Sequence, residues 1–284
     1  MTVVMVILCG SCPLSAEDFA ELSPKIMETL DSIKSYEMTV SYSERIRGAK
    51  ALIVRMESIC SSSIIFKSPN LLYIKAAGKT TQGIGGKKTV QDLSIYTTFD
   101  GKHQNVRLSM VTDGRSVTNS IVLDTATNTP EHPFDGWNLK GFGLTQGRDY
   151  IGTVRDLLPP YDFVSVGQKE DVIEFKGTFN IDKCTAMLRK TMAPEQAKSF
   201  AQISGSMVKE LRIRVDAKRL LVVGYTKIDT LAKRTCDFEN IKIDKGIHDK
   251  VFAFQSVPGE QFRDITDFVR KSRERSEQVL APNR

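Results

Sequence analysis

The chain has 284 residues, of which 40% are apolar and 26% are charged, proportions that are ordinary for a soluble globular protein. Its length is enough to bury a substantial core, as one large domain rich in β-strands or as two small ones. The formal net charge of +6 is mild, and the basic residues are spread through the chain, which argues against a nucleic-acid-binding protein.

The N-terminus has the pattern of an export signal. Residues 2–8 are almost wholly apolar, and small residues follow up to Ala16, just before the acidic pair Glu17 and Asp18. The run is too short to span a bilayer, which takes about 20 residues. We therefore predict a signal peptide over residues 1–16, a mature chain over 17–284, and a periplasmic location. No Lys or Arg precedes the apolar run, which indicates a weak signal or a true start further upstream. A buried N-terminal strand is the alternative interpretation.

The cysteines raise two further questions. Cys12 stands where a lipid is attached in bacterial lipoproteins, but the leucine usual three positions upstream is missing, so anchoring through a lipid is the less favoured alternative. The mature chain keeps Cys60, Cys184 and Cys236. An odd number allows at most one internal disulfide, with Cys184–Cys236 as the pair to consider.

The first predicted elements are a helix and a strand. Ser23 and Pro24 fit the N-cap and first helical position, and apolar residues recur at helical spacing up to Ile33, although apolar residues before Ser23 allow a start near Ala16. A clean alternation follows over residues 36–43, which predicts a half-buried antiparallel strand.

Short extended segments and turn signals then alternate along the chain. Strands are expected near 52–56, 64–67, 71–75, 92–98, 106–110, 116–123, 163–166, 172–176, 211–215, 220–228 and 235–243. Asp100-Gly101 and Asp113-Gly114 are hairpin signals, and the glycine-rich stretch 78–86 reads as a loop. This spacing predicts a meandering antiparallel sheet.

Helices and loops are predicted in the remaining segments. Residues 124–149 read as a loop that holds the single tryptophan, Trp137. Helices are expected over 151–158, over 183–200 with an interruption near Pro194, and over the basic tail 265–280. The alternating Phe252 and Phe254 predict a last strand, which Pro258-Gly259 would stop. No repeat or linker divides the chain, so one domain is expected.

Catalytic and metal-binding patterns are hard to find. The three histidines fall in predicted turns or loops, no Cys-x-x-Cys remains in the mature chain, and Gly78-Lys79-Thr80 lacks the earlier glycine of a phosphate-binding loop. We therefore expect no enzyme, no cofactor and no metal. An enzyme that uses Cys184 is the weakest of the hypotheses, since a lone cysteine on an apolar segment is usually just packed.

The predicted architecture itself suggests a protein with a ligand-binding cavity. A curved antiparallel sheet whose inner face is not filled by helices encloses a cavity suited to an apolar ligand. Tyr36, Met38, Val40 and Tyr42 share one face of the first strand and have the required character. The alternative is ordinary core packing, which is the commoner fate of such stripes.

Four motifs, in order, resemble the LolA family of outer-membrane lipoprotein carriers. They are Ile33-Lys34-Ser35-Tyr36, then Phe66-Lys67-Ser68-Pro69-Asn70-Leu71, then Phe99-Asp100-Gly101-Lys102, and finally Lys250-Val251-Phe252-Ala253-Phe254 with Pro258-Gly259 and Asp264. The resemblance implies an incomplete antiparallel β-barrel, mostly β, with helices covering the open side and an apolar cavity for acyl chains.

That resemblance also implies which residues line the cavity. They are Tyr36, Met38, Val40, Tyr42, Phe66, Leu71, Tyr73, Leu211, Ile213, Val215, Phe252 and Phe254. One departure concerns the arginine that such carriers have before the Pro-Asn turn and that is implicated in lipoprotein release. This chain has Ser68 there, and a hydroxyl cannot replace that cation.

The expected function is thus an exported, non-enzymatic carrier of lipid or lipoprotein acyl chains that hands its ligand to a membrane-bound partner. The alternative is a lipid-sensing interaction module. Its basic tail, with Arg270, Lys271, Arg273 and Arg275, would then contact a membrane or a partner, although an ordinary solvated helix explains the same charges.

Overall fold

A computed structural model describes residues 16–47, 54–84, 87–125, 128, 134, 142–145, 147–190 and 192–271. The apolar run of the predicted signal peptide, Trp137 and the basic residues Arg273 and Arg275 therefore lie outside the described residues. Within these ranges, none of the helices combines the length and the apolar character needed to cross a bilayer.

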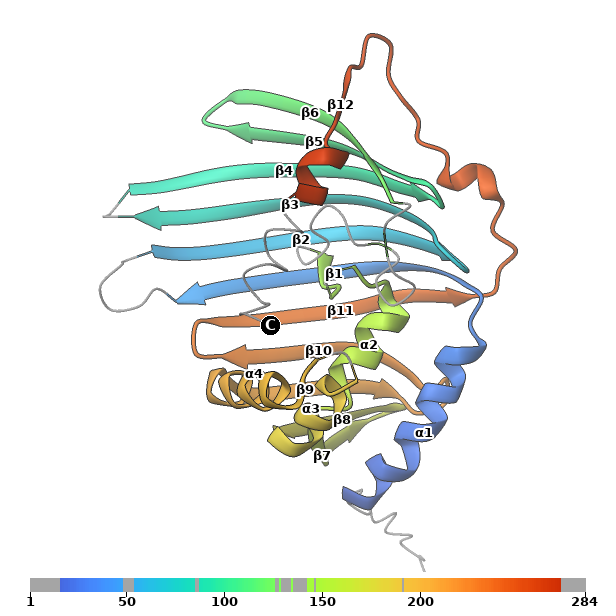
Figure 1. Ribbon diagram of the computed structural model, residues 1–284, viewed down its shortest axis with the longest axis vertical. Helices are drawn as coiled ribbons and strands as arrows, with labels where there is room; N and C mark the ends of the chain where they lie inside the picture. The colour runs from blue at the N-terminus through green and yellow to red at the C-terminus, as the bar shows by residue number, and fades with distance from the viewer. Residues whose placement is uncertain are drawn as a thin grey trace, which may run out of the picture.

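Twelve strands form one open sheet, in the order β12-β6-β5-β4-β3-β2-β1-β11-β10-β9-β8-β7 (Figure 1). The strands are β1 Ser35–Arg47, β2 Val54–Lys67, β3 Leu71–Ile84, β4 Lys87–Asp100, β5 His103–Thr112, β6 Arg115–Asp124, β7 Tyr161–Lys169, β8 Val172–Phe179, β9 Val208–Asp216, β10 Leu221–Asp229, β11 Ala232–Ile243 and β12 Phe262–Asp264. Neighbouring strands are antiparallel except β12, which pairs with β6 in parallel. The predicted mostly-β, open antiparallel half-barrel is confirmed.

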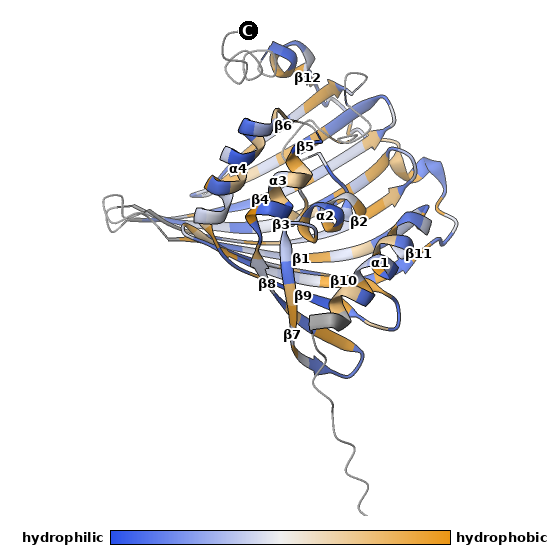
Figure 2. Ribbon diagram, turned by 60° about the horizontal axis from the view of Figure 1, so that its bottom comes forward, coloured by the Kyte–Doolittle hydropathy of each residue, from blue (hydrophilic) through white to orange (hydrophobic). Residues whose placement is uncertain are grey.

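Four helices lie on one side of this sheet, which we call the inner face (Figure 1). They are α1 Ala16–Ser32, α2 Tyr150–Leu157, α3 Ile181–Leu188 and α4 Pro194–Met207. A short 3-10 helix, η2 Asp249–Phe252, follows β11, and residues 266–271 are helical again after β12. In Figure 2 the helices stand above the sheet, and polar and apolar segments alternate along the strands.

The predicted hairpins have the geometry that their residues favour. Asp113 and Gly114 both have positive φ angles, 50° and 76°, as a two-residue turn between twisted strands requires. At the β4–β5 turn, the Asp100 carboxylate accepts hydrogen bonds from the backbone N–H groups of Lys102 and His103 at 2.9 and 2.7 Å. These local contacts fix where each strand reverses.

The N-cap predicted at Ser23 is wrong, because α1 already begins at Ala16 and Pro24 lies inside it. Tertiary packing explains the longer helix: the Phe19 ring lies 4.4 Å from that of Phe163 and 4.9 Å from that of Phe175. Burial of this ring contributes about 1.5–3 kcal/mol, which offsets much of the cost of a proline inside a helix, about 3 kcal/mol. The alternative start near Ala16 is the observed one.

The glycine-rich loop predicted over 78–86 is also wrong over most of its length, because β3 continues to Ile84. Gly78 pairs with Cys60 of β2. A Cβ at this position would lie 2.7 Å from the Ile59 carbonyl oxygen. The glycine therefore marks a close approach between neighbouring strands, not a turn.

The strand predicted at Phe252 and Phe254 is the third correction. Phe252 ends η2, and Phe254 lies in an irregular segment. His248 caps η2 by accepting a hydrogen bond from the Lys250 N–H at 3.2 Å, while the Lys67 ammonium binds the Ile247 carbonyl and the Asp249 carboxylate. Local alternation was misleading because this segment packs against the outer face of the sheet, where Phe254 stacks on Tyr96 of β4, and does not pair with a strand.

Candidate functional site

Strand register aligns the inner-face side chains of β1 to β6 in rows that cross the sheet. The deepest row holds Tyr36, Phe66, Leu72, Phe99 and Gln104, and the next holds Met38, Ile64, Ile74, Thr97 and Val106. All ten side chains are buried. Two further rows begin at Val40 and at Tyr42. Apolar residues thus dominate this face along four successive rows.

The deepest row is closed by α2 and packs as a core. The Tyr36 ring stacks on Phe66 at 5.0 Å and meets Tyr150 edge-on at 5.7 Å. Its hydroxyl accepts a hydrogen bond from the Tyr150 N–H at 2.9 Å and donates one to the Asp149 carboxylate at 3.4 Å. Burial raises the pKa of Tyr36 well above its usual value, so this hydroxyl stays protonated. We call this end of the inner face the sealed end, because its rings are buried and the Tyr36 hydroxyl is hydrogen-bonded on both sides.

The inner face is less covered at several positions of β2, β4, β5 and β6. We call its partly buried apolar residues the open floor: Cys60, Leu93, Leu108, Met110 and Ile121. Beside them, Val117 of β6 is 52% exposed. Burial also raises the pKa of the Cys60 thiol to about 11, so this residue acts as an apolar side chain at neutral pH. The floor offers apolar surface that neighbouring elements only partly cover.

A row of polar residues borders the apolar rows at one end of the inner face. Register places side by side Lys227 of β10, Arg234 of β11, Glu44 of β1, Ser58 of β2, Thr80 of β3, Gln91 of β4 and Thr112 of β5, which we call the polar row. The Ser58 and Thr80 hydroxyls lie 3.1 Å apart, and the Gln91 amide donates to the Thr112 hydroxyl at 3.2 Å. The inner face is therefore amphipathic along its strands.

Two carboxylates of this region bind the same arginine. Arg234 donates to Glu44 at 2.7 Å and to Asp229 at 2.5 Å. Asp229 also accepts from the backbone N–H groups of Leu231 and Ala232 at 2.8 and 2.6 Å, and these contacts hold its pKa below the usual value. Lys227, directly opposite Arg234, makes no ion pair or hydrogen bond among the described residues.

Helix α4 exposes an apolar stripe at the same end of the sheet. Phe200, Ile203 and Met207 recur at helical spacing and are 42%, 55% and 40% exposed. The Met207 carbonyl accepts a hydrogen bond from the Thr230 N–H at 2.9 Å, which ties the end of α4 to the β10–β11 turn. The stripe therefore stands near the polar row rather than over the sealed end.

The residues predicted to line a cavity fall on two faces. Tyr36, Met38, Val40, Tyr42, Phe66, Leu211, Ile213 and Val215 are buried on the inner face. Leu71 and Tyr73 alternate with buried Leu72 and Ile74 and so lie on the outer face. Phe254 stacks on Tyr96, which also faces outward, at 4.7 Å, and Phe252 lies in η2 nearby. The structure thus brings eight of the twelve to one face.

Ser68 lies in the turn between β2 and β3, away from the open floor. It lines a cleft of about 240 Å³ together with Phe66, Asp149, Arg148 and Arg155. Arg148 is paired with Asp156 at 3.2 Å, and Arg155 is paired with Asp31 of α1. The cleft therefore contains cations, although position 68 supplies none.

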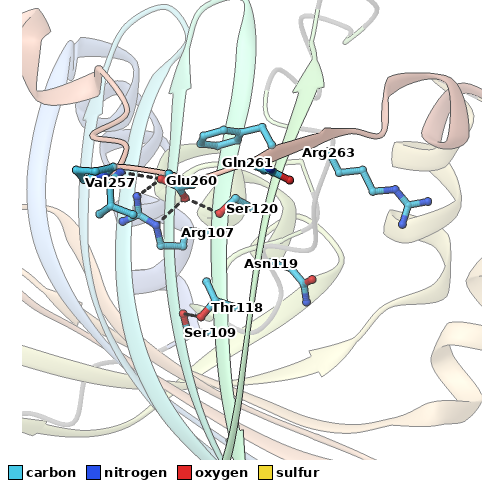
Figure 3. A pocket seen from close by; sticks show the side chains of 12 residues that line it. Arg107, Ser109, Thr118, Asn119, Ser120, Val257, Glu260, Gln261 and Arg263 are labelled. Atoms are coloured by element: carbon cyan, nitrogen blue, oxygen red, sulfur yellow. Dashed lines mark hydrogen bonds and ion pairs between the residues drawn. The ribbon is translucent and has the colours of Figure 1, made fainter.

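A larger pocket, of about 780 Å³, lies on the outer face between β5, β6 and residues 253–264, which we call the strap (Figure 3). Glu260 of the strap is paired with Arg107 of β5 and accepts a hydrogen bond from the Ser120 hydroxyl at 2.5 Å. The Arg107 guanidinium also lies over the rings of Tyr96 and Phe254, 5.6 and 5.2 Å from their centroids. These contacts attach the strap to the sheet.

Catalytic or metal-binding side chains do not form a cluster elsewhere in the described chain. Within it, no group of three His, Cys, Asp or Glu side chains is placed to hold a metal ion. The three cysteines that the structure describes are free thiols, so the considered Cys184–Cys236 pairing is wrong. The Cys236 thiol lies 3.9 Å from the Gly143 carbonyl, whereas Cys184 lies in α3. Burial raises the pKa values of Cys184 and Cys236, the opposite of what an activated thiol needs.

Sequence reasoning missed the polar row and the strap's anchor. One signal was available for Lys227: it occupies the same alternating phase as buried Tyr225 in β10. A lysine in the apolar phase of a half-buried strand is unusual. The Arg107–Glu260 pair had no comparable signal, since these residues lie far apart in the chain.

Comparisons with known proteins do not assign the chain to a family. No family model and no curated protein matches the chain. Several solved structures are similar to it. They include a DUF1329 family protein from Desulfovibrio piger, with 11% identity and a TM-score of 0.26 over 84% of this chain and 97% of that one. A β-barrel-like DUF1849 protein from Brucella abortus has 10% identity and a TM-score of 0.29 over 75% of this chain and 99% of that one. A LolA superfamily protein from Nitrosomonas europaea has 8% identity and a TM-score of 0.26 over 81% of this chain and 97% of that one. Likeness at this level carries no functional argument, and the LolA resemblance stays a prediction.

Proposed function

We propose that this protein is an exported carrier that binds the acyl chain of a lipid or lipoprotein on the inner face of its sheet and delivers it to a membrane-bound acceptor. Binding and release need no chemical step. The proposal is supported above all by one feature of the inner face: the open floor is apolar, only partly covered, and bordered by the polar row at one end.

The amphipathic layout matches the chemistry of an acyl lipid. Each methylene that leaves water for the open floor contributes about 0.8 kcal/mol, so a chain of ten methylenes would contribute about 8 kcal/mol before the costs of ordering the ligand are subtracted. The Ser62 hydroxyl, within the row that begins at Val40, is buried and has no hydrogen-bond partner in the part of the chain that the structure describes. A polar atom of a ligand or a water molecule would relieve that cost.

The proposal is tested by acyl-probe uptake with a matched pair of variants. The purified full chain is titrated with a fluorescent fatty acid, and its lipid extract is analysed by mass spectrometry. Leu108→Asp places a charge on the open floor and should weaken uptake strongly. Val111→Asp, on the same strand but on the outer face and 38% exposed, should leave uptake unchanged. Absence of any acyl ligand and of any uptake would refute the proposal.

Export is tested separately. Expression of the full chain in a Gram-negative host, followed by N-terminal sequencing, should give a mature chain that begins at Glu17 in the periplasmic fraction. An uncleaved chain in the cytoplasm would contradict this part of the proposal and would leave acyl binding to be judged on its own measurement.

A further inference from the structure

The strap pairs with only part of β6, the strand next to it in the sheet. β12 pairs with residues 120–122, so residues 115–119 have no strand on the side away from β5 within the described ranges, and all of them are exposed. The Ile265 N–H donates to the Val122 carbonyl at 3.1 Å, and backbone groups two residues apart point the same way along a strand. The N–H and C=O groups of Ser116 and Thr118 therefore also point away from β5, where no described residue binds them.

This free part of the edge lacks the features that usually prevent another strand from adding to a sheet. Edge strands are commonly protected by a bulge, a proline or several charges. β7, at the opposite edge, has a register irregularity between Ser165 and Gly167. β6 pairs with β5 without any shift, and its residues 115–119 include one charge, Arg115, and no proline. An extended peptide can therefore pair with the backbone here.

One row of inner-face positions leads from this free edge directly across the open floor. We call it the edge row, and from β6 to β1 the register aligns in it Val117, Met110, Leu93, Gly78, Cys60 and Tyr42. Of these only Tyr42 is buried, and Gly78 has no side chain to interrupt the row. The distance from β6 to β2 is about 19 Å at the usual spacing of strands. The edge row is therefore a continuous, mostly apolar track that begins at the 52% exposed Val117.

We infer that the free edge of β6 binds, as an added strand, an extended peptide that carries an acyl chain, and that the acyl chain lies along the edge row. This inference rests on the proposed carrier function. An acylated peptide contacts both the edge and the floor, whereas a fatty acid contacts the floor alone. Side chains at aligned positions of neighbouring strands share a face, so an acylated side chain opposite Val117 would point to the start of the edge row.

The strap leaves room for one strand at this edge. Residues 257–263 line the pocket of about 780 Å³ together with Thr118 and Asn119, whose side chains point to opposite sides of β6 below the strap (Figure 3). This volume is within the usual range of ligand sites. A second copy of the chain would bring its own strap, held by Arg107 and Glu260, against this one. The geometry therefore favours a single peptide over edge-to-edge pairing of two sheets.

The experiment titrates three fluorescent probes into the full chain: a short peptide palmitoylated at its N-terminal cysteine, the same lipopeptide with its backbone nitrogens methylated, and palmitic acid. Methylation removes the backbone donors and blocks strand pairing, so it should weaken binding to the wild type about 3- to 10-fold, as the loss of backbone hydrogen bonds does. Hydrogen exchange of the Ser116 and Thr118 amides, measured by NMR, should slow when the unmethylated lipopeptide binds, while exchange in β7 should not change.

A pair of variants at one position isolates the backbone group. Thr118→Pro removes a donor that points away from β5 and so spares the β5–β6 ladder. It should weaken lipopeptide binding by the same factor of about 3 to 10 and leave palmitic acid within about twofold. Thr118→Val keeps the N–H and the shape of the side chain and should retain all three affinities.

The two proposals fail in different ways. If palmitic acid binds but the two lipopeptides bind equally well and the Ser116 and Thr118 amides gain no protection, the edge site is refuted and the carrier function stands. If no probe binds, the carrier function fails and this inference falls with it. A wild-type dimer in sedimentation that Thr118→Pro dissociates would assign the edge to a second copy and overturn the inference. Should Thr118→Pro not fold, as judged by circular dichroism, hydrogen exchange of the wild type decides the question.

Discussion

Lys227 and Arg234 lie directly opposite each other on β10 and β11, yet only Arg234 is held by carboxylates. The asymmetry costs stability, because desolvation of an ammonium without a contact partner disfavours the folded state. A residue that destabilises the fold is a candidate for a role in binding. Stability measurements can therefore separate a functional lysine from a merely tolerated one.

We predict that Lys227→Met stabilises the protein. The pKa of Lys227 lies below its usual 10.5, so at neutral pH the unfolded chain holds the proton more favourably, and wild-type stability rises as pH approaches 10.5. Removing the amine should raise Tm by about 2–4 °C at pH 7, the shift that roughly 1 kcal/mol produces in a large domain. Differential scanning calorimetry measures this shift. A lower Tm for the variant would show that the lysine stabilises the fold.

Tyr36→Phe should destabilise the sealed end. It removes the hydroxyl that accepts from the Tyr150 N–H and donates to Asp149, leaving a buried donor unpaired at a cost of about 1–3 kcal/mol. Urea unfolding gives the difference directly. Tyr73→Phe on the outer face is the control and should change the unfolding free energy by less than about 0.5 kcal/mol. Equal values for the two variants would contradict the role of the network.

Gly78→Ala should destabilise the sheet although alanine usually stabilises relative to glycine. The new Cβ would lie 2.7 Å from the Ile59 carbonyl oxygen, and overpacking of this kind costs about 1–3 kcal/mol. Gly167→Ala is the matched change in β7, where nothing lies within 4 Å of the added atom, and it should be neutral or slightly stabilising. Thermal unfolding of the pair distinguishes a close approach from an ordinary strand glycine.

Much of this fold is predictable because most strands carry their own signal. The alternation from Tyr36 to Tyr42 predicts β1, and Asp113-Gly114 predicts its hairpin, since burial and turn geometry act over a few residues. The same reasoning failed at Phe252 and Phe254. There, contacts from Lys67 to Ile247 and Asp249 outweigh the local pattern.

The candidate site was far less predictable. The polar row joins Glu44, Ser58, Thr80 and Gln91 from four strands with Arg234 and Lys227 from two later ones, and only the register of the finished sheet brings them together. A shift of one residue in any strand would move its member to the outer face. Sequence alone gives the residue types but not that register.

Acidification should release the strap. Its contacts with Arg107 and Ser120 lower the pKa of Glu260 to about 2, from a usual value of 4.5. This attachment is therefore complete above about pH 4.5 and is lost as pH falls toward 2. Hydrogen exchange of residues 253–264 should accelerate over that range, and Glu260→Gln should have the same effect at pH 7.

The control for this prediction is Glu57→Gln, which removes a surface ion pair with Arg45 and should leave exchange in the strap unchanged. Protection of the strap that stays unchanged from about pH 5 down to about pH 2 in the wild type would show that aromatic stacking on Tyr96, not the Glu260 carboxylate, holds it in place.

The most direct test of acyl binding on the inner face is photo-crosslinking with a fatty acid that carries a diazirine in its chain, followed by mass spectrometry of the labelled peptides. The account predicts adducts on the open floor, at Leu93, Leu108 and Met110, that decrease when unlabelled fatty acid competes. Labelling confined to the outer face, or labelling that competitor does not reduce, would contradict it.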